Sequence, residues 1–532
     1  MGTHRPVTDT IDKTKRKELL ILIFCLVLGF SLRYYTFDHK SLWIDEVHTF
    51  NDSREGIEGH IKYFKEHPSD FLHPPLFYLL THLFSPFQKP ERDLRIFPLI
   101  FGILSIPMIY FLAKLFSPCI AFPCALSLGL MTYHISFSQD GRSYSLLMFL
   151  GMVGLYFFVQ HLKTSKKGHL FLAAFFFAVL FYTSYTSIPF IVFCQLLWFY
   201  QIGENKKPNF SSFLILNGIV FLLCVPWIIF IAINYRQHPI LDDVFRVEVG
   251  SFWDIIWGTF NDWAPFAPLT AISIILLFLF PIFSQNRKNT LLLLTSIFSP
   301  IFGLFIFYKI FNINHYFTSR YVINFLPFFL ISIFLSLNAI EAKLLDRWKR
   351  IPRFTLLFLI LFLASNMVIL PLYYRSEKQD FRGLVSYLES QLQDGDKIFV
   401  KSIAYIPGML HYFRVYPGSR HYDFPVWVDD SGYEILAKVT LIGPNKKFTI
   451  HYSSLGYFRY LVDGTRLWII VGKTDLNETK ECSASVLKGY FDGTFCNFRR
   501  FPSDASMYLF LRDPKSPNER GMTPPLEGRK VK

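Results

Sequence analysis

Two adjacent carboxylates, Asp45 and Glu46, follow the first apolar stretch of the chain within the sequence SLWIDEVHTF. Trp43 and the apolar residues around the pair favour a position against a membrane surface, although a solvated pair of loop acids is the plainer interpretation. A carboxylate held at such a place can accept a proton from a hydroxyl group and act as a general base. The pair therefore predicts acid–base chemistry at the edge of a membrane.

Two further groups of polar residues lie at the ends of apolar stretches. Asp140 and Arg142 lie in SFSQDGRSYSLLMF, and an ionisable residue at a membrane boundary needs a partner, a cavity or a function. The alternative is a simple ion pair at the start of a helix. Arg320 and Tyr321 lie in TSRYVINF. An Arg binds phosphate through two parallel hydrogen bonds, but it can also extend to the membrane interface without a ligand.

These residue types fit one reaction well, the attack of a hydroxyl on an activated sugar whose leaving group is a lipid-anchored phosphate. That reaction needs a general base and stabilisation of the charge on the leaving group. The sequence contains no P-loop, no GxSxG and no HExxH motif. ATP-driven transport and hydrolysis by a catalytic triad are therefore disfavoured.

The elements that must position these residues are membrane helices. The chain has 532 residues, of which 52% are hydrophobic, including 61 Phe. This composition indicates a polytopic membrane protein. The net charge of +14 comes from short basic clusters between apolar stretches, so we find no nucleic-acid-binding module. Of the seven Cys, only Cys482 and Cys496 lie in the polar C-terminal part, where they could pair in an oxidising compartment.

Eleven apolar stretches have about the length that a helix needs to cross a bilayer. They cover residues 19–36, 97–115, 119–137, 144–161, 169–186, 188–202, 211–232, 267–284, 290–308, 321–340 and 354–373. Alternate connections carry most of the Lys and Arg, which by the positive-inside rule makes them cytoplasmic. The N-terminus is then cytoplasmic and the C-terminus lies outside, on the same side as the three polar groups.

The predicted organisation has four parts. Residues 1–18 form a cytoplasmic tail, and 19–373 a transmembrane domain whose long first outer loop, 37–96, contains amphipathic segments that lie on the membrane. Residues 374–513 form a small α/β domain outside the membrane, because KIFV, LWIIVG and YLFLRD have the pattern of strands. Residues 514–532 are predicted to be a disordered tail.

Five motifs, in order, resemble the bacterial branch of the GT-C membrane glycosyltransferases, which includes protein O-mannosyltransferases and the lipid A aminoarabinose transferase. They are LWIDEVHTF, HPPLFYLL, SQDGRSYSLLMFL, SRYVINFLPFFL and YYRSEKQDFRGLVSYLESQLQDGD, within about residues 18–400. The resemblance implies a GT-C fold and transfer of a sugar from a polyprenyl-phosphate donor on the non-cytoplasmic side.

The resemblance also implies roles for individual residues. Asp45 matches the catalytic base, supported by Glu46. Asp140 stands where relatives often have Glu in a Gln-Glu-Ala-Arg-x-Tyr pattern, from which Asp140 and Gly141 depart. The residues expected to contact the acceptor or the carrier phosphate are His73, Arg142, Tyr144, Arg320 and Tyr321. A divalent cation (Mg, Mn or Ca) is an open question, and its ligands would be Asp140, Glu46 and His73.

The sequence therefore predicts a glycosyltransferase of a bacterial inner membrane that modifies a lipid, a glycan or a protein on the periplasmic face. Its partners are the polyprenyl-phosphate sugar donor, the bilayer and the acceptor, without nucleic acid. A transporter or flippase for lipid-linked sugars is an alternative, but it predicts ionisable residues in the middle of several spans, which are nearly free of them. A glycan polymerase or ligase is a further alternative, and the long acidic first loop argues against it.

Overall fold

A computed structural model of the whole chain describes most of its residues. These are 7–54, 56–66, 73–199, 210–234, 251–310, 318–345, 353–400, 405–414, 426–428, 435–442, 447–452, 464–472, 497–501 and 506–515. The chain divides into two compact units, Met1–Asp38 with Glu55–Tyr373, and His39–Arg54 with Tyr374–Lys532. Residues 39–54, predicted to be part of the first outer loop, thus belong to the second unit. Cys482, Cys496 and most of the predicted tail lie outside the described residues.

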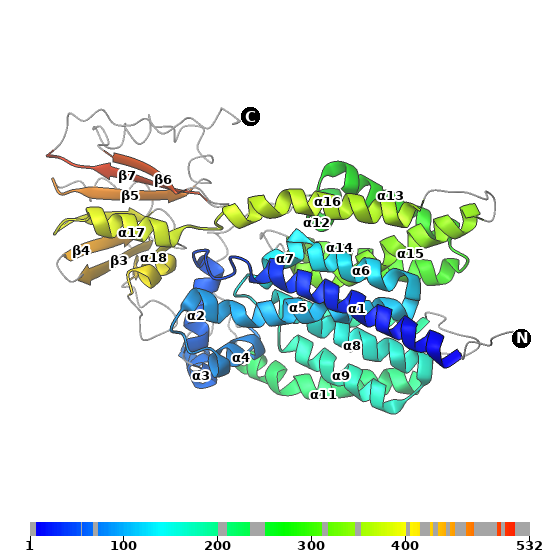
Figure 1. The fold of residues 1–532 in the computed structure, drawn as a ribbon. Helices are drawn as coiled ribbons and strands as arrows, with labels where there is room; N and C mark the ends of the chain where they lie inside the picture. Colours follow the sequence, from blue (N-terminus) through cyan, green and yellow to red (C-terminus); the bar gives the residue numbers. More distant parts are fainter. Residues whose placement is uncertain are drawn as a thin grey trace, which may run out of the picture. The chain divides into compact units, whose positions relative to one another are not determined.

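The first unit is helical (Figure 1). All eleven predicted spans fall on its helices. The elements are α1 (Val7–Tyr34), α3 (Gly56–Glu66), α4 (Leu76–Phe84), α5 (Pro90–Phe116), α6 (Pro118–Leu130), α7 (Thr132–Ser138), α8 (Tyr144–Thr164), α9 (Lys167–Phe181), α10 (Ser187–Cys194), η1 (Gln195–Phe199), α11 (Phe210–Asn234), α12 (Phe252–Trp263), α13 (Ala267–Phe283), α14 (Arg287–Ile310), η2 (Ser319–Phe325), α15 (Leu326–Leu345) and α16 (Phe354–Arg375).

Fewer than eleven of these helices are long and apolar enough to cross a membrane. Among the described residues six meet that test, namely α5, α8, α11, α14, η2 with α15, and α16. Two bent pairs, α6 with α7 (59°) and α12 with α13 (108°), raise the number to eight if each pair is one span. The other predicted spans lie on the shorter helices α9 and α10 with η1, and on α1, whose apolar stretch has charged residues at both ends. The polytopic helical fold is confirmed, whereas the count of eleven is too high by this test.

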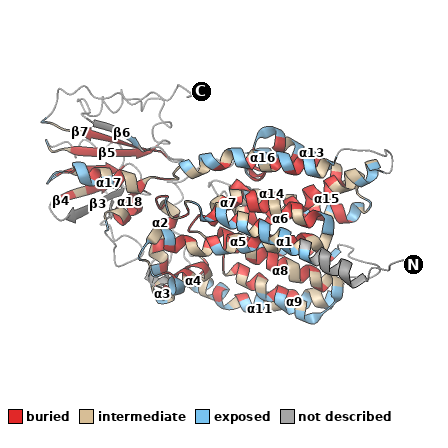
Figure 2. Ribbon diagram, viewed as in Figure 1, coloured by how far each residue is buried: buried red, intermediate tan, exposed pale blue. Residues whose placement is uncertain are grey.

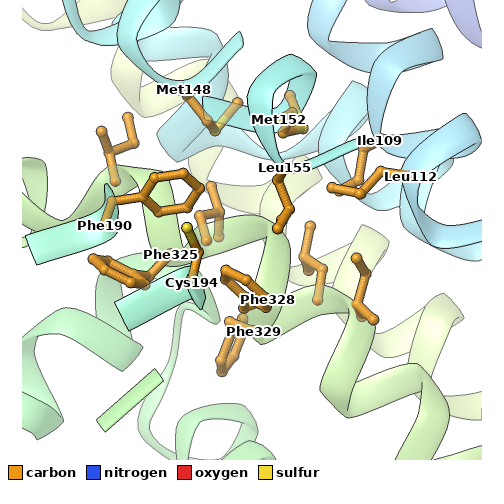
Figure 3. Close-up of a cluster of buried hydrophobic side chains, with 14 of the residues drawn as sticks. Ile109, Leu112, Met148, Met152, Leu155, Phe190, Cys194, Phe325, Phe328 and Phe329 are labelled. Atoms are coloured by element: carbon orange, nitrogen blue, oxygen red, sulfur yellow. The ribbon is translucent and has the colours of Figure 1, made fainter. Parts of the chain in front are cut away.

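The core of the first unit is built from aliphatic and aromatic side chains of several helices. Figure 3 shows Met148 and Leu155 of α8 packing near Phe190 of α10 and Phe328 of α15. The outward faces are also apolar, because Leu222 of α11 is 70% exposed and α11 is largely exposed in Figure 2. A large exposed apolar surface of this kind suits contact with lipid.

The second unit contains a seven-stranded mixed sheet in the order β2-β3-β4-β1-β5-β7-β6. β1 pairs in parallel with β4 and β5, and the other pairs are antiparallel. The predicted strands KIFV, LWIIVG and YLFLRD lie on β1, β5 and β7. The elements are α2 (Ile44–Arg54), α17 (Phe381–Gln391), β1 (Lys397–Val400), α18 (Ile406–Tyr412), β2 (Val426–Val428), β3 (Ile435–Ile442), β4 (Lys447–Tyr452), β5 (Leu467–Gly472), β6 (Asn497–Phe501) and β7 (Met507–Arg512).

One strand near the middle of the sheet, β5, has no charged residue along its whole length. Every residue of β5 is buried, as expected for a strand covered on both faces. Trp468 of β5 packs in the same core as Leu388 of α17 and donates its indole N–H to Asp396 Oδ2 at 2.9 Å. The partner satisfies the one polar group of this buried ring.

Candidate active site

The predicted base and its neighbour lie in the first turn of α2, in the second unit. Glu46 is 1% exposed, and its Oε2 accepts the backbone N–H of Trp43 at 3.3 Å. It thereby bonds one of the N–H groups that a helix start leaves without a partner. Asp45 is half-buried, and its carbonyl oxygen accepts the Thr49 hydroxyl at 3.0 Å. Of the two carboxylates, Asp45 therefore has the more accessible side chain.

In the first unit, the loop that carries Asp140 is fixed by the end of α1. The Gln139 side-chain amide donates to the carbonyl oxygens of Arg33 (2.8 Å) and Tyr35 (2.7 Å). Asp140 is 1% exposed, and its carbonyl oxygen accepts the N–H of Arg142 at 2.7 Å. The loop is therefore a tight turn, and Asp140 is a buried group within the first unit.

Arg33 supports this loop from the side of α1. Its fully buried guanidinium donates to the carbonyl oxygens of Leu128 (2.9 Å) and Gly129 (2.7 Å), and its Nε donates to Ser138 Oγ at 3.1 Å. The carbonyls near the end of α6 lack helical partners because the helix bends before α7. The side chain of Arg33 thus connects α1, α6 and α7, which lead into the turn at Asp140.

Arg142, His73 and Tyr144 each have an aromatic neighbour in the first unit. Arg142 Nη1 donates to the hydroxyl of Tyr78 at 3.5 Å, and the His73 ring lies 5.8 Å from that of Tyr78. Pro75 precedes α4 and brings the HPPLFY segment into place, since Pro suits the start of a helix. Tyr144, at the start of α8, packs against Phe137 at 5.0 Å between ring centres.

Arg320 and Tyr321 lie in the first turn of η2, directly after Ser319. The Arg320 guanidinium stacks on the Tyr321 ring at 5.3 Å, and the neighbouring Ser319 donates its hydroxyl to Asp262 Oδ2 at 2.6 Å. Tyr133 of α7 lies close to Ser319, Asp262 and Tyr144. These contacts connect the segment after Asp140 with the segment that holds Arg320.

The structure thus joins two of the three predicted groups inside the first unit. His73, Arg142 and Tyr144 are linked through Tyr78 and Tyr133 to the η2 segment, whereas Asp45 and Glu46 lie in the other unit. Sequence reasoning missed Asp262, Tyr78 and Tyr133. Asp262 is the acid of TFNDWAP in the aromatic-rich loop, so a carboxylate beside Trp was the available signal. No three His, Cys, Asp or Glu side chains come together as a metal site in the described part of the chain.

Comparisons with known proteins give a family match over part of the chain and a similar fold over most of it. Residues 72–230 match the family model described as dolichyl-phosphate-mannose-protein mannosyltransferase. The apo crystal structure of ArnT from Cupriavidus metallidurans aligns over 94% of this chain and 98% of its own, with 12% identity and a TM-score of 0.52. ArnT from the same bacterium bound to undecaprenyl phosphate aligns over 93% and 97%, with 12% identity and a TM-score of 0.49. No curated protein is significantly similar in sequence.

The two kinds of match support different statements. The family match includes His73, Asp140, Arg142 and Tyr144 and therefore covers most of the first-unit residues predicted from the sequence. The alignment with apo ArnT concerns the fold and extends over nearly the whole chain. The family model confirms the resemblance to the GT-C membrane glycosyltransferases, and with it the predicted class of enzyme, over residues 72–230. The alignment with apo ArnT confirms the fold alone.

Proposed function

We propose that this protein transfers a sugar from a polyprenyl-phosphate carrier to a hydroxyl group of a lipid, a glycan or a protein. The observation that carries the proposal is the match of residues 72–230 to a family named for a dolichyl-phosphate donor. That segment contains the His73, Asp140, Arg142 and Tyr144 predicted to serve this chemistry. The polytopic fold supports it, because a donor with a long lipid chain stays in the membrane.

The proposed reaction has one proton acceptor and one group of cations. Asp45 removes the proton of the acceptor hydroxyl, whose oxygen then bonds to the anomeric carbon of the sugar. The bond between that carbon and the carrier phosphate breaks, and the phosphate leaves with the electron pair. Arg142 and Arg320, whose planar groups suit phosphate, stabilise its charge. Asp45 later releases its proton to water.

The remaining residues have supporting roles in this proposal. Glu46 holds the first turn of α2 and so supports Asp45. Asp140 and His73 contact the sugar or the acceptor, and Tyr144 and Tyr321 line the path of the carrier phosphate. In this proposal the reaction takes place on the outer face of a bacterial inner membrane. The distribution of basic residues among the connections supports an outer face opposite the N-terminus.

The test compares cell-envelope glycolipids and glycoproteins by mass spectrometry, with the wild-type gene, without it, and with Asp45→Asn. One sugar should be missing without the gene and remain missing with Asp45→Asn, because the amide cannot accept the proton. Asp52→Asn is the matched control, since Asp52 is also a half-buried acid on α2. Normal sugar transfer by Asp45→Asn would refute the assignment.

The same preparation separates transfer from transport. Transfer breaks the bond between the sugar and the phosphate, so membranes with the active protein should release free polyprenyl phosphate in proportion to the sugar gained by the acceptor. A transporter would move the lipid-linked sugar intact. Relocation of the donor without release of the carrier would therefore support a transporter and contradict the proposal.

A further inference from the structure

The segment before α2, residues 39–44, is held by side chains that follow α16 more than 330 positions later. We call residues 39–44 the strap. Glu377 Oε2 accepts the backbone N–H of Ser41 at 3.0 Å, and Gln379 Oε1 accepts the N–H of Ile44 at 2.8 Å. Both contacts lie within the second unit. The two side chains belong to the motif SEKQDFR, which begins directly after α16 and ends in the first turn of α17.

The same motif also donates hydrogen bonds to backbone carbonyl groups of the strap. Arg382 Nη1 donates to the carbonyl oxygen of His39 at 2.9 Å, and Nη2 donates to that of Lys40 at 3.2 Å. The backbone N–H of Arg382 donates to Ser41 Oγ at 3.2 Å. The fork of one Arg thus fixes two consecutive peptide groups, which a point charge such as Lys could not do.

Two further contacts complete the attachment. The Tyr412 hydroxyl, at the end of α18, accepts the N–H of Leu42 at 2.7 Å. Lys378 Nζ lies 4.4 Å from the centre of the Trp43 ring, within the range of a cation–π interaction. The Trp43 N–H is taken by Glu46, so the backbone N–H groups from Ser41 to Ile44 all have a side-chain acceptor.

This pattern fixes the start of α2 rather than merely covering it. Residues 41–43 have no regular secondary structure, so side chains supply the partners that their backbone N–H groups need. Ile44, whose N–H is bonded to Gln379, is the first residue of α2 and immediately precedes Asp45. The position of the Asp45 backbone is therefore set by residues 377–382.

We propose that Glu377, Gln379 and Arg382 are positioning residues that hold the first turn of α2 so that Asp45 meets the acceptor hydroxyl. The inference rests on the proposed function of Asp45. It gives the SEKQDFR motif a task in sugar transfer, namely the alignment of the base Asp45. Because a misplacement of about 1 Å can slow an enzyme about 100-fold, loosening the strap should reduce the rate of the chemical step.

The test uses pairs of variants in the full-length protein. Glu377→Met and Gln379→Met remove an acceptor and keep a side chain of similar length, whereas Glu377→Gln keeps an acceptor for the Ser41 N–H. Gln391→Met, at the exposed end of α17, is the control for a Gln-to-Met change outside the strap. Thermal unfolding in detergent verifies that each variant is folded.

Two measurements are made on each variant. The first is kcat and KM for the carrier-linked sugar identified by the envelope comparison. We expect kcat to fall at least about 10-fold in both Met variants, with KM within about twofold, and Glu377→Gln to keep at least about a third of the wild-type kcat. The second is hydrogen exchange of the peptide covering residues 40–47, which should be faster in the two Met variants only.

The outcomes separate this inference from the proposed function. Unchanged exchange in Gln379→Met, or faster exchange with unchanged kcat in a protein that Asp45→Asn inactivates, would overturn the positioning role. An increase in KM with an unchanged kcat would also overturn the positioning role. If Asp45→Asn transferred sugar normally, the assignment of Asp45 as the base would fail, and the positioning role would fail with it, even though faster exchange would still verify the strap contacts. The proposed function itself would fail only if no sugar were missing without the gene.

Discussion

Asp45 and Glu46 are chemically alike but have different surroundings. Glu46 is almost fully buried and bonds the backbone N–H of Trp43, so its carboxylate has a structural task at the start of α2. Asp45 keeps accessible surface in the same helical turn. The two carboxylates therefore differ in how accessible they are, not in their chemistry.

Glu377 gives a prediction about pH. Burial raises the pKa of its carboxyl group, and the nearby Asp380 raises it further, whereas the Ser41 N–H, Lys40 and Arg382 act in the opposite direction. The folded state therefore favours the protonated form. Its contribution to stability is present at acidic pH and is lost as the pH rises from the usual carboxyl pKa through the raised one.

Glu377→Gln should consequently be at least as stable as the wild type at pH 8, because the amide keeps an acceptor without a charge. The advantage should be smaller at pH 5, because the wild-type side chain is more protonated there than at pH 8. Thermal unfolding of both proteins in detergent at the two pH values measures this. A wild type that gains stability over Glu377→Gln as the pH rises would contradict the predicted direction.

At the scale of the elements, the bend between α6 and α7 depends on Arg33. Its guanidinium is fully buried and bonds the carbonyls of Leu128 and Gly129 and the hydroxyl of Ser138. Arg33→Met would leave these acceptors without donors, at a cost of about 3 kcal/mol or more. Thermal unfolding should show a clearly lower Tm, whereas Arg16→Met, an exposed Arg on the same helix, should change it little. Equal effects of both would argue against a special role of Arg33.

The packing of α5 against α7 gives another prediction. A Cβ atom at Gly102 would lie 2.6 Å from the Cβ of Ser138, which is closer than packed atoms tolerate. Gly102→Ala should therefore move α7 and weaken the bond from Arg33 to Ser138, lowering stability by about 1–3 kcal/mol. Gly218→Ala on α11 is the control, since a Cβ there meets nothing within 4 Å. A Gly102→Ala protein as stable as this control would show that α7 can adjust without cost.

At the scale of the whole molecule, the sequence predicted what depends on local patterns. Apolar stretches located the helices, and KIFV and LWIIVG identified the buried strands β1 and β5. Contacts between residues that are far apart in the sequence leave no such local pattern. The bond between Ser41 and Glu377 joins positions 336 residues apart, and neither residue type suggests the other. For the same reason Asp262 was missed, because its link to Ser319 depends on how α12 and η2 meet.

The orientation of the whole chain in the membrane gives the last prediction. The basic connections predict that the loop between α8 and α9 is cytoplasmic, and that the loop between α4 and α5 is outside. Cys substitutions at Gly168, in the first turn of α9 after the first of these loops, and at Gln88, in the second, report on the two sides; both residues are exposed. The exposed native Cys119 is first replaced by Ser, as are Cys482 and Cys496, which lie in the part predicted to be outside. A maleimide that does not cross membranes should label Gln88→Cys in spheroplasts with intact inner membranes, and Gly168→Cys only after the membrane is opened.

Labelling is read by the mass of the purified protein, and denatured samples of both variants verify that each thiol can react. Reaction of Gly168→Cys in intact spheroplasts, with Gln88→Cys protected, would invert the orientation. The segment that carries His73, which lies in the same outer loop as Gln88, would then face the cytoplasm. A donor presented outside could not reach it, so this result would also contradict transfer on the outer face.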